Sequence, residues 1–320
     1  MILYTPARAA TKIPIIDLTR SFSSDLADRR AVGWEIHKAC RETGFFYVSQ
    51  HRIADRLMAA QLDWTAQFFA LPMEEKLAID FSQSPRRLGY EPALRQVLDE
   101  GSAPDLKESY MYAVPSASGG ERAMPAVENL WPAGLAGFRE QMLIYHAAIG
   151  DLALHLMRSI ALSLDLDENF FDPAFAGTPF SVRLLHYPPQ GGIAPCNQLG
   201  AGAHTDWGGI TLLLQDGKGG LEVLSADGDW ISATPIPGTF VVNLGDLLRR
   251  WTNDLYQSTL HRVANTKGGK ARYSVATFFS PWPETTVTCI PSCAQGRPQL
   301  YPPITAREHT AAMARRTYGT

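Results

Sequence analysis

The chain has 320 residues, and at roughly 150 residues per domain this length allows two domains or one large sheet-centred domain. Hydrophobic residues make up 45% and charged residues 19%, which supplies apolar material for a core and excludes a disordered chain. The formal charge of −3 provides no positive field for nucleic acid or an anionic membrane, so neither is expected as a partner.

Membrane insertion and disulfide bonding are not expected either. No run approaches the ~20 consecutive apolar residues of a membrane span, and the first residues lack the basic and apolar regions of a signal peptide. We therefore expect a cytoplasmic protein. The cysteines do not form a zinc-binding pattern and are expected to be free thiols; they are Cys40, Cys196, Cys289 and Cys293.

The first half of the chain is predicted to be rich in helices. The run IPIIDL is typical of a short buried strand, residues 26–40 have helical spacing that ends near Gly44, and GFFYVSQH is typical of a second strand. Another helix is predicted over residues 55–70, and a long helix ends near Leu164. Residues 82–133 are rich in Pro, Gly, Ser and Arg, which favours irregular structure with short strands that could cover a site.

From Phe180 onward the pattern changes to that of strands. Short apolar runs, separated by glycine, proline and aspartate turns, predict an antiparallel sandwich or barrel; they are SVRLLHYP, GGITLLLQ, GLEVLS, WISATP, TFVVNLGD, LYQSTLHRVAN and ARYSVATFF. A final amphipathic helix is predicted in ITAREHTAAMARRTYG. The pattern alone leaves open two domains or a single α+β unit.

Two histidines and one aspartate form the sharpest chemical pattern. His204 and Asp206 are two residues apart and share a face if the backbone is extended. His261 lies in a later predicted strand, which a barrel could bring across from them. Two imidazoles and one carboxylate on one side of a metal leave its other positions open, which suits non-haem Fe(II) that activates oxygen.

A second polar group follows on the predicted strands. Arg272 and Ser274 share a face, and a buried arginine needs an anion such as the carboxylate of a dicarboxylate co-substrate. In SVRLLHYP the same alternation places Arg183 and Tyr187 on one face and His186 on the other. Tyr187 could donate its hydroxyl to the same carboxylate, or it could pack as an ordinary core aromatic.

These residues, with runs such as DLKESY, GGLEVL and STLHRVAN in the same order, resemble the 2-oxoglutarate- and Fe(II)-dependent oxygenases. The resemblance is to the isopenicillin N synthase-like branch and covers roughly residues 13–315. It implies an α+β, mainly β fold, in which a double-stranded β-helix (jelly roll) barrel is framed by N-terminal and C-terminal helices. It also implies a single functional unit over 1–320: a helix-rich N-terminal region (1–179), a jelly-roll core (180–285), and a C-terminal extension with a helix (286–320).

The resemblance further implies roles for the polar residues. The implied Fe(II) ligands are His204, Asp206 and His261. The implied contacts to the distal carboxylate of 2-oxoglutarate are Arg272, Ser274 and, as a helper, Tyr187. Dioxygen would be the second co-substrate, and ascorbate a supporting reductant. A small-molecule metabolite would be hydroxylated, desaturated or cyclised while succinate and CO2 are released.

Other functions stay open at this point. Isopenicillin N synthase and the aminocyclopropane-carboxylate oxidases work without 2-oxoglutarate, an ethylene-forming reaction would also use this motif, and a jelly roll can serve as a non-catalytic binding module. Candidate substrate contacts are aromatic or arginine residues, for which ordinary packing is the alternative; they are Arg87, Tyr90, Tyr110, Trp207, Arg249, Trp251 and Phe278. Together they indicate a partly aromatic pocket for a small, carboxylated or ring-bearing metabolite.

Overall fold

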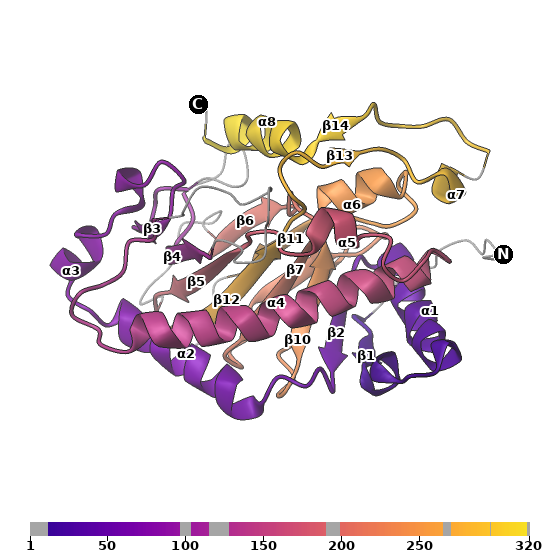
Figure 1. The fold of residues 1–320 in the computed structure, drawn as a ribbon. Coiled ribbons are helices and arrows are strands. Elements are labelled where there is room, and N and C mark those ends of the chain that lie inside the picture. The colour runs from indigo at the N-terminus through magenta and orange to yellow at the C-terminus, as the bar shows by residue number, and fades with distance from the viewer. Residues whose placement is uncertain are drawn as a thin grey trace.

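The computed structural model describes residues 12–96, 104–114, 128–189, 199–264, 270–294 and 296–318. In it, two β-sheets lie beside a layer of helices, and Figure 1 shows the long helix α4 (Phe138–Ser163) crossing in front of the larger sheet. Cys40, Cys289 and Cys293 are free, buried thiols, as predicted. The fourth cysteine, Cys196, and the PSASGGER stretch lie outside the described residues. Within those residues, no helix is long and apolar enough to span a membrane.

The larger sheet has eight strands, in the order β1-β2-β10-β7-β12-β5-β4-β3. Their bounds are Ile15–Asp17 (β1), Phe45–Ser49 (β2), Gly89–Glu91 (β3), Glu108–Ala113 (β4), Ser181–Tyr187 (β5), Ile210–Gln215 (β7), Phe240–Leu244 (β10) and Arg272–Phe279 (β12). Neighbouring strands are antiparallel, except that β1 and β2 are parallel. The helix-rich first half of the chain therefore contributes four of these strands, β1 to β4.

The smaller sheet has four strands, in the order β6-β11-β8-β9. Their bounds are Ala201–His204 (β6), His261–Val263 (β11), Leu221–Leu224 (β8) and Trp230–Ser232 (β9). A separate pair consists of Thr286–Val287 (β13) and Ile304–Thr305 (β14). Strand β6 was not predicted, because its sequence, Ala-Gly-Ala-His, has neither β-branched residues nor an apolar alternation.

The predicted long helices are present, and several short ones join them. The bounds of the long helices, besides α4, are Leu26–Glu42 (α1), Asp55–Phe69 (α2) and Ala306–Tyr318 (α8). Those of the short helices are Met73–Leu77 (α3), Asp172–Phe175 (α5), Asp246–Trp251 (α6), Pro291–Ala294 (α7), and the 3-10 turns Thr19–Phe22 (η1) and Phe81–Gln83 (η2). Helix α1 begins where the Asp25 carboxylate accepts a hydrogen bond from the Ala27 N–H.

Strand alternation divides the apolar residues between two clusters. On β5, Val182 and Leu184 pack in the main core together with α4, whereas Leu185 and Tyr187 belong to a smaller cluster. The smaller cluster also contains residues of the other sheet, such as Val223 of β8. The inner face of β5 is therefore turned toward the smaller sheet and away from the helices.

Candidate functional site

His204, Asp206 and His261 come together at one edge of the smaller sheet. His204 ends β6, Asp206 lies in the following loop, and His261 begins β11, where it pairs directly with His204. One potential ligand atom from each residue lies within 4.8 Å of the other two. His261 Nε2 is 3.9 Å from Asp206 Oδ1. The structure thus gathers the three residues that the sequence predicted as a metal site.

Backbone carbonyls orient both imidazoles. His204 Nδ1 donates a hydrogen bond to the Gly202 carbonyl at 2.7 Å, and His261 Nδ1 donates to the Thr259 carbonyl at 3.1 Å. A ligating histidine normally donates its other ring N–H in this way, which fixes its tautomer and its orientation. Both Nε2 atoms are therefore left with their lone pairs available for a metal.

The carboxylate of Asp206 is oriented in a comparable way. Its Oδ2 accepts hydrogen bonds from Thr211 Oγ1 at 2.6 Å and from Asn243 Nδ2 at 2.7 Å, while Oδ1 faces His261. Burial raises the pKa of Asp206, but the nearby imidazoles and these two hydrogen bonds outweigh it and lower the pKa. Burial and the neighbouring His261 lower the pKa of His204. The charge states are those of a ligand set, with an ionised carboxylate and a neutral imidazole.

This arrangement fits a divalent metal. Two ligand atoms that each lie about 2.1 Å from one ion are at most about 4.2 Å apart. The His261–Asp206 separation of 3.9 Å is within that limit, and the 4.8 Å that bounds all three ligand atoms exceeds it slightly, so the side chains would close a little around a bound ion. Two nitrogens and one oxygen on one side of a metal are the donor set of non-haem Fe(II) oxygenases, which keep the remaining positions for other ligands.

Arg272, at the start of β12, is fully buried and bonded only to neutral groups among the residues described. Its Nε donates to the Gly219 carbonyl at 2.6 Å, Nη1 to Ser274 Oγ at 3.2 Å, and Nη2 to Gln215 Oε1 at 3.2 Å. No carboxylate in the described part of the chain forms an ion pair with it. A buried guanidinium is costly without an anion, so this side chain fits the binding of an acidic ligand.

Tyr187 lies beside Arg272 on the neighbouring strand. The two residues are direct cross-strand partners, and the guanidinium carbon lies 4.7 Å from the centre of the tyrosine ring. Burial raises the pKa of Tyr187 even though Arg272 opposes this effect. The hydroxyl therefore stays protonated and able to donate to an anion bound at Arg272.

A cavity of about 540 Å³ connects the two groups. Its lining includes the three metal-site residues, Tyr187, Arg272 and Ser274. Aromatic rings of Phe45, Trp207 and Phe278 form part of its wall, and α8 adds Thr310 and Ala314. A metal ion, an acidic co-substrate and a further small molecule could therefore meet in this one cavity.

One wall of the cavity carries an ion-paired network. Arg183 pairs with Glu91 and donates from Nε to Ser109 Oγ at 2.9 Å, and Ser109 Oγ donates to Glu91 at 3.1 Å. Lys107 also lines the cavity and pairs with Asp105. Burial lowers the pKa of Lys107 to about 8, although Asp105 opposes this shift. This wall offers hydrogen-bond donors and acceptors to a ligand.

Three residues of this wall were not predicted from the sequence: Glu91, Lys107 and Ser109. A period-two pattern could have identified two of them, because Lys107 and Ser109 in DLKESY share one face. The same alternation puts the predicted substrate contact Tyr110 on the opposite face, where its hydroxyl donates to the Leu130 carbonyl at 2.8 Å. Tyr90 likewise faces away from the cavity and donates to Glu108.

The other predicted substrate contacts divide in the same way. Arg87, Trp207 and Phe278 line the cavity. Arg249 pairs instead with Asp254 at 2.8 Å. Trp251 lines a separate cavity of about 680 Å³. Four of the seven predicted contacts, Tyr90, Tyr110, Arg249 and Trp251, thus lie outside the lining of the cavity that holds the metal-site residues.

Two family models match the chain. Residues 13–134 match the model described as "non-haem dioxygenase in morphine synthesis N-terminal". Residues 179–281 match the "2OG-Fe(II) oxygenase superfamily". The second match contains all three metal-site residues, Arg272 and Ser274.

Known proteins resemble the chain over nearly its whole length. The 2-oxoglutarate-Fe(II) type oxidoreductase hxnY of Emericella nidulans is 39% identical, over 97% of this chain and 92% of that protein. Homoarginine-6-hydroxylase 2-ODD-233 of Oryza sativa is 40% identical, over 85% of this chain and 84% of that protein.

A solved structure is similar in fold as well. A full-length protein of Neurospora crassa, crystallised in complex with alpha-KG, has a TM-score of 0.85 and 33% identity, covering 94% of this chain and 95% of that one. Another structure of the same Neurospora crassa protein contains alpha-KG and thymine and has a TM-score of 0.83, with 32% identity over 95% of this chain and 97% of that one.

Proposed function

The chain belongs to the 2-oxoglutarate- and Fe(II)-dependent oxygenases of the isopenicillin N synthase-like family, and we propose how its residues divide the work of that chemistry. It is a non-haem dioxygenase that couples decarboxylation of 2-oxoglutarate to oxidation of a small molecule. We propose that His204, Asp206 and His261 hold the Fe(II). The observation that carries this proposal is that the two imidazole Nε2 atoms and Asp206 Oδ1 lie close together. The remaining polar side-chain atoms of these residues, the two Nδ1 atoms and Oδ2, are hydrogen-bonded elsewhere.

We propose that Arg272, Ser274 and Tyr187 bind the distal carboxylate of 2-oxoglutarate. The buried guanidinium, bonded to neutral groups, supports this role, as does the protonated phenol beside it. Arg272 and the metal-site residues line the same cavity, so one keto acid can reach both groups. Binding at both ends would fix the orientation of 2-oxoglutarate before oxygen reacts.

Bound Fe(II) and 2-oxoglutarate supply the activation of O2, which yields succinate, CO2 and an oxidised substrate. The protein itself orients the ligand side chains and forms the wall around the reacting centre. The carbonyls of Gly202 and Thr259 fix the tautomer and the orientation of the two imidazoles, and Thr211 and Asn243 hold the Asp206 carboxylate. The apolar and aromatic wall excludes water from the reacting centre.

For the fold, we propose that the two sheets form a double-stranded β-helix barrel framed by the N-terminal and C-terminal helices. The proposed regions of this single unit are 1–179, 180–285 and 286–320. Opposing residues of both sheets in the smaller apolar cluster support a barrel interior. Thr310 and Ala314 of α8 line the cavity, which supports a single unit that includes the C-terminal extension.

For the substrate, we propose a small polar molecule that lies between the metal and the wall of Glu91, Lys107, Ser109 and Arg183. This wall offers donors and acceptors together, and Trp207 and Phe278 offer ring faces. The solved relative that contains thymine supports a ligand of this size and character. We do not include the four predicted contacts that lie outside the cavity lining.

The assignment of the metal ligands is tested with His261→Ala. The purified variant should lose stoichiometric Fe(II) binding and release no succinate from 2-oxoglutarate, because it lacks one of three ligands. His155→Gln is the matched control: it removes a partly buried imidazole from α4, where His155 contacts Ser21, and should retain both properties. Full iron binding and succinate release in His261→Ala would contradict the assignment. Iron-loaded wild-type protein that oxidises its substrate without releasing succinate would indicate a 2-oxoglutarate-independent oxidase.

A further inference from the structure

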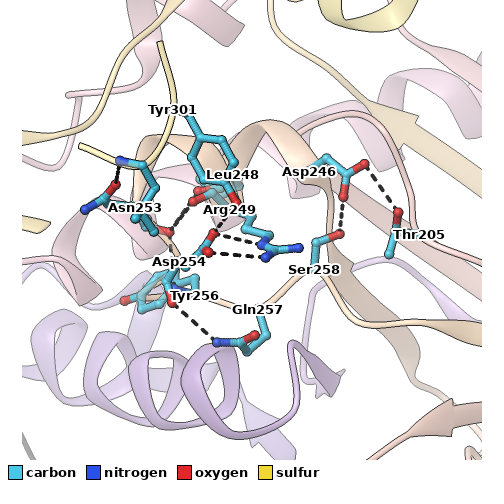
Figure 2. A network of polar contacts seen from close by, with 12 residues as sticks. Thr205, Asp246, Leu248, Arg249, Asn253, Asp254, Tyr256, Gln257, Ser258 and Tyr301 are labelled. Atoms are coloured by element: carbon cyan, nitrogen blue, oxygen red, sulfur yellow. Dashed lines mark hydrogen bonds and ion pairs between the residues drawn. The ribbon is translucent and has the colours of Figure 1, made fainter. Parts of the chain in front are cut away.

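The carboxylate of Asp246, the first residue of α6, touches both segments that carry the proposed metal ligands (Figure 2). Its Oδ2 accepts a hydrogen bond from Thr205 Oγ1 at 3.3 Å, and its Oδ1 accepts one from Ser258 Oγ at 2.7 Å. Thr205 lies between His204 and Asp206 in the sequence. Ser258 directly precedes Thr259, the residue whose carbonyl orients the ring of His261.

The backbone around Asp246 holds the same loop. The Asp246 N–H donates to the carbonyl of Asp206 at 2.8 Å, and the Leu247 N–H donates to the carbonyl of Gly208 at 3.1 Å. Helix α6 thus uses N–H groups that its own first turn leaves free. A Cβ on the preceding Gly245 would lie 2.3 Å from the Gly208 carbonyl oxygen, so this close approach requires glycine.

Sheet pairing alone does not set all three ligand positions. His204 and His261 are paired on adjacent strands, but the pairing shifts register between His261 and Val263. Asp206 lies beyond the end of β6, where no ladder bond holds it in place. Its distance from His261 therefore depends on contacts made by the loop and by the segment before β11.

We propose that Asp246 is a positioning residue that sets the spacing between the His204–Asp206 segment and the His261 segment. This inference rests on the proposed function, in which those segments hold Fe(II). The two hydroxyls both donate to the carboxylate, so one side chain links segments 53 residues apart, from Thr205 to Ser258. Loss of this link would leave the ligands themselves intact but less well arranged before the metal binds.

The side chain at position 246 can be changed in two steps. Asp246→Asn keeps the size but replaces one acceptor oxygen with an NH2 donor, so one of the two hydroxyl contacts must rearrange. Asp246→Ala removes both contacts. Residues that orient metal ligands typically contribute 10- to 100-fold to metal affinity, so we expect Fe(II) affinity to fall by about that factor in Asp246→Ala and by less in Asp246→Asn.

Asp254→Asn is the matched control. Asp254 follows the other end of α6, pairs with Arg249 at 2.8 Å and accepts a hydrogen bond from Tyr301 at 2.7 Å (Figure 2). Its side chain contacts neither ligand-bearing segment. This variant therefore disturbs a charged network on the same helix, and we expect its Fe(II) affinity to stay within about twofold of wild type.

The experiment measures the Fe(II) dissociation constant of the full chain anaerobically, by competition with a chelator. Thermal melting of the metal-free proteins checks that each variant is folded, and Ser258→Ala tests one of the two links alone. The expected order of affinity is wild type and Asp254→Asn, then Ser258→Ala and Asp246→Asn, then Asp246→Ala. The visible absorption of the Fe(II)–2-oxoglutarate complex should return in the variants once they are saturated with iron.

Two results would overturn the proposal. Folded Asp246→Asn and Asp246→Ala proteins with wild-type Fe(II) affinity would show that the link is unnecessary. Equal weakening by Asp254→Asn would show that general damage around α6 explains the loss. His261→Ala is measured in the same titration. If it binds Fe(II) as tightly as wild type, the proposed metal site itself is wrong. If His261→Ala loses Fe(II) affinity while the Asp246 variants keep theirs, only the positioning role is refuted.

Discussion

Replacing Arg272 gives a quantitative test of the proposed 2-oxoglutarate site. Its guanidinium has five N–H donors, and three of them are used by Gly219, Ser274 and Gln215. Two donors, on the terminal nitrogens, remain for a carboxylate. Arg272→Met should therefore remove a two-point, charge-assisted contact to 2-oxoglutarate while the metal-site residues stay in place.

The size of the effect follows from this count. A hydrogen bond to a charged group contributes about 1.5–3 kcal/mol, and each 1.4 kcal/mol is a factor of about ten in affinity. Loss of one such contact would weaken 2-oxoglutarate binding about 12-fold to 140-fold. Because the second contact is lost as well, we take this range as the minimum expected rise in KM for 2-oxoglutarate.

The assay is succinate release at saturating Fe(II), with 2-oxoglutarate varied, and Fe(II) affinity measured separately. Arg272→Lys is the matched variant, because it keeps the charge but loses the planar fork; its KM should lie between those of wild type and Arg272→Met. An unchanged KM for 2-oxoglutarate in folded Arg272→Met would refute the carboxylate role. A parallel loss of Fe(II) affinity would show that the substitution disturbs the metal site instead.

Two further predictions concern single side chains. Tyr187→Phe should raise the KM for 2-oxoglutarate about fivefold, the equivalent of one hydrogen bond of about 1 kcal/mol, without changing Fe(II) affinity; an unchanged KM would leave Tyr187 as a packing residue. Burial lowers the pKa of His146 to about 4, compared with its ordinary value of 6.5. As pH falls, His146 therefore takes up a proton in the unfolded chain before it does so in the folded one. Between about pH 6.5 and 4 this difference should reduce the free energy of unfolding by up to about 1.4 kcal/mol per pH unit. Above that range His146 should have no such effect. His146→Gln can still donate to the Phe180 carbonyl that His146 contacts in the wild type. This variant should show a smaller fall of melting temperature per pH unit over that interval, and an unchanged slope would contradict the assignment.

Local patterns predicted the residues of the site better than its surroundings. His204, Asp206, Arg272 and Ser274 each have an i, i+2 partner within a single strand or at its end, and this spacing fixes a shared face without knowledge of the fold. His261 required in addition that two strands be neighbours, which the resemblance to a family indicated.

Residues of the cavity wall were predicted less well from the sequence. In DLKESY, residue type favoured the aromatic Tyr110, whereas the alternation of the strand turns Lys107 and Ser109 toward the cavity. Arg249 and Trp251 lie on α6, a short helix that was not predicted, and the direction of that helix decides what they contact.

The supporting contacts of the metal site depend on tertiary structure. Asp246 contacts Thr205 and Ser258, which are 41 residues before it and 12 residues after it. No periodic pattern reports a contact of that kind. It arises because α6 packs its N-terminus against the loop that follows β6.

The central claim is that His204, Asp206 and His261 together hold the catalytic iron. The most direct measurement is an anomalous difference map at the iron absorption edge, from crystals grown anaerobically with Fe(II) and 2-oxoglutarate. We expect one iron peak per chain, within coordination distance of His204 Nε2, Asp206 Oδ1 and His261 Nε2. An iron peak elsewhere, or a fully loaded protein whose iron lacks any of these three ligands, would contradict it.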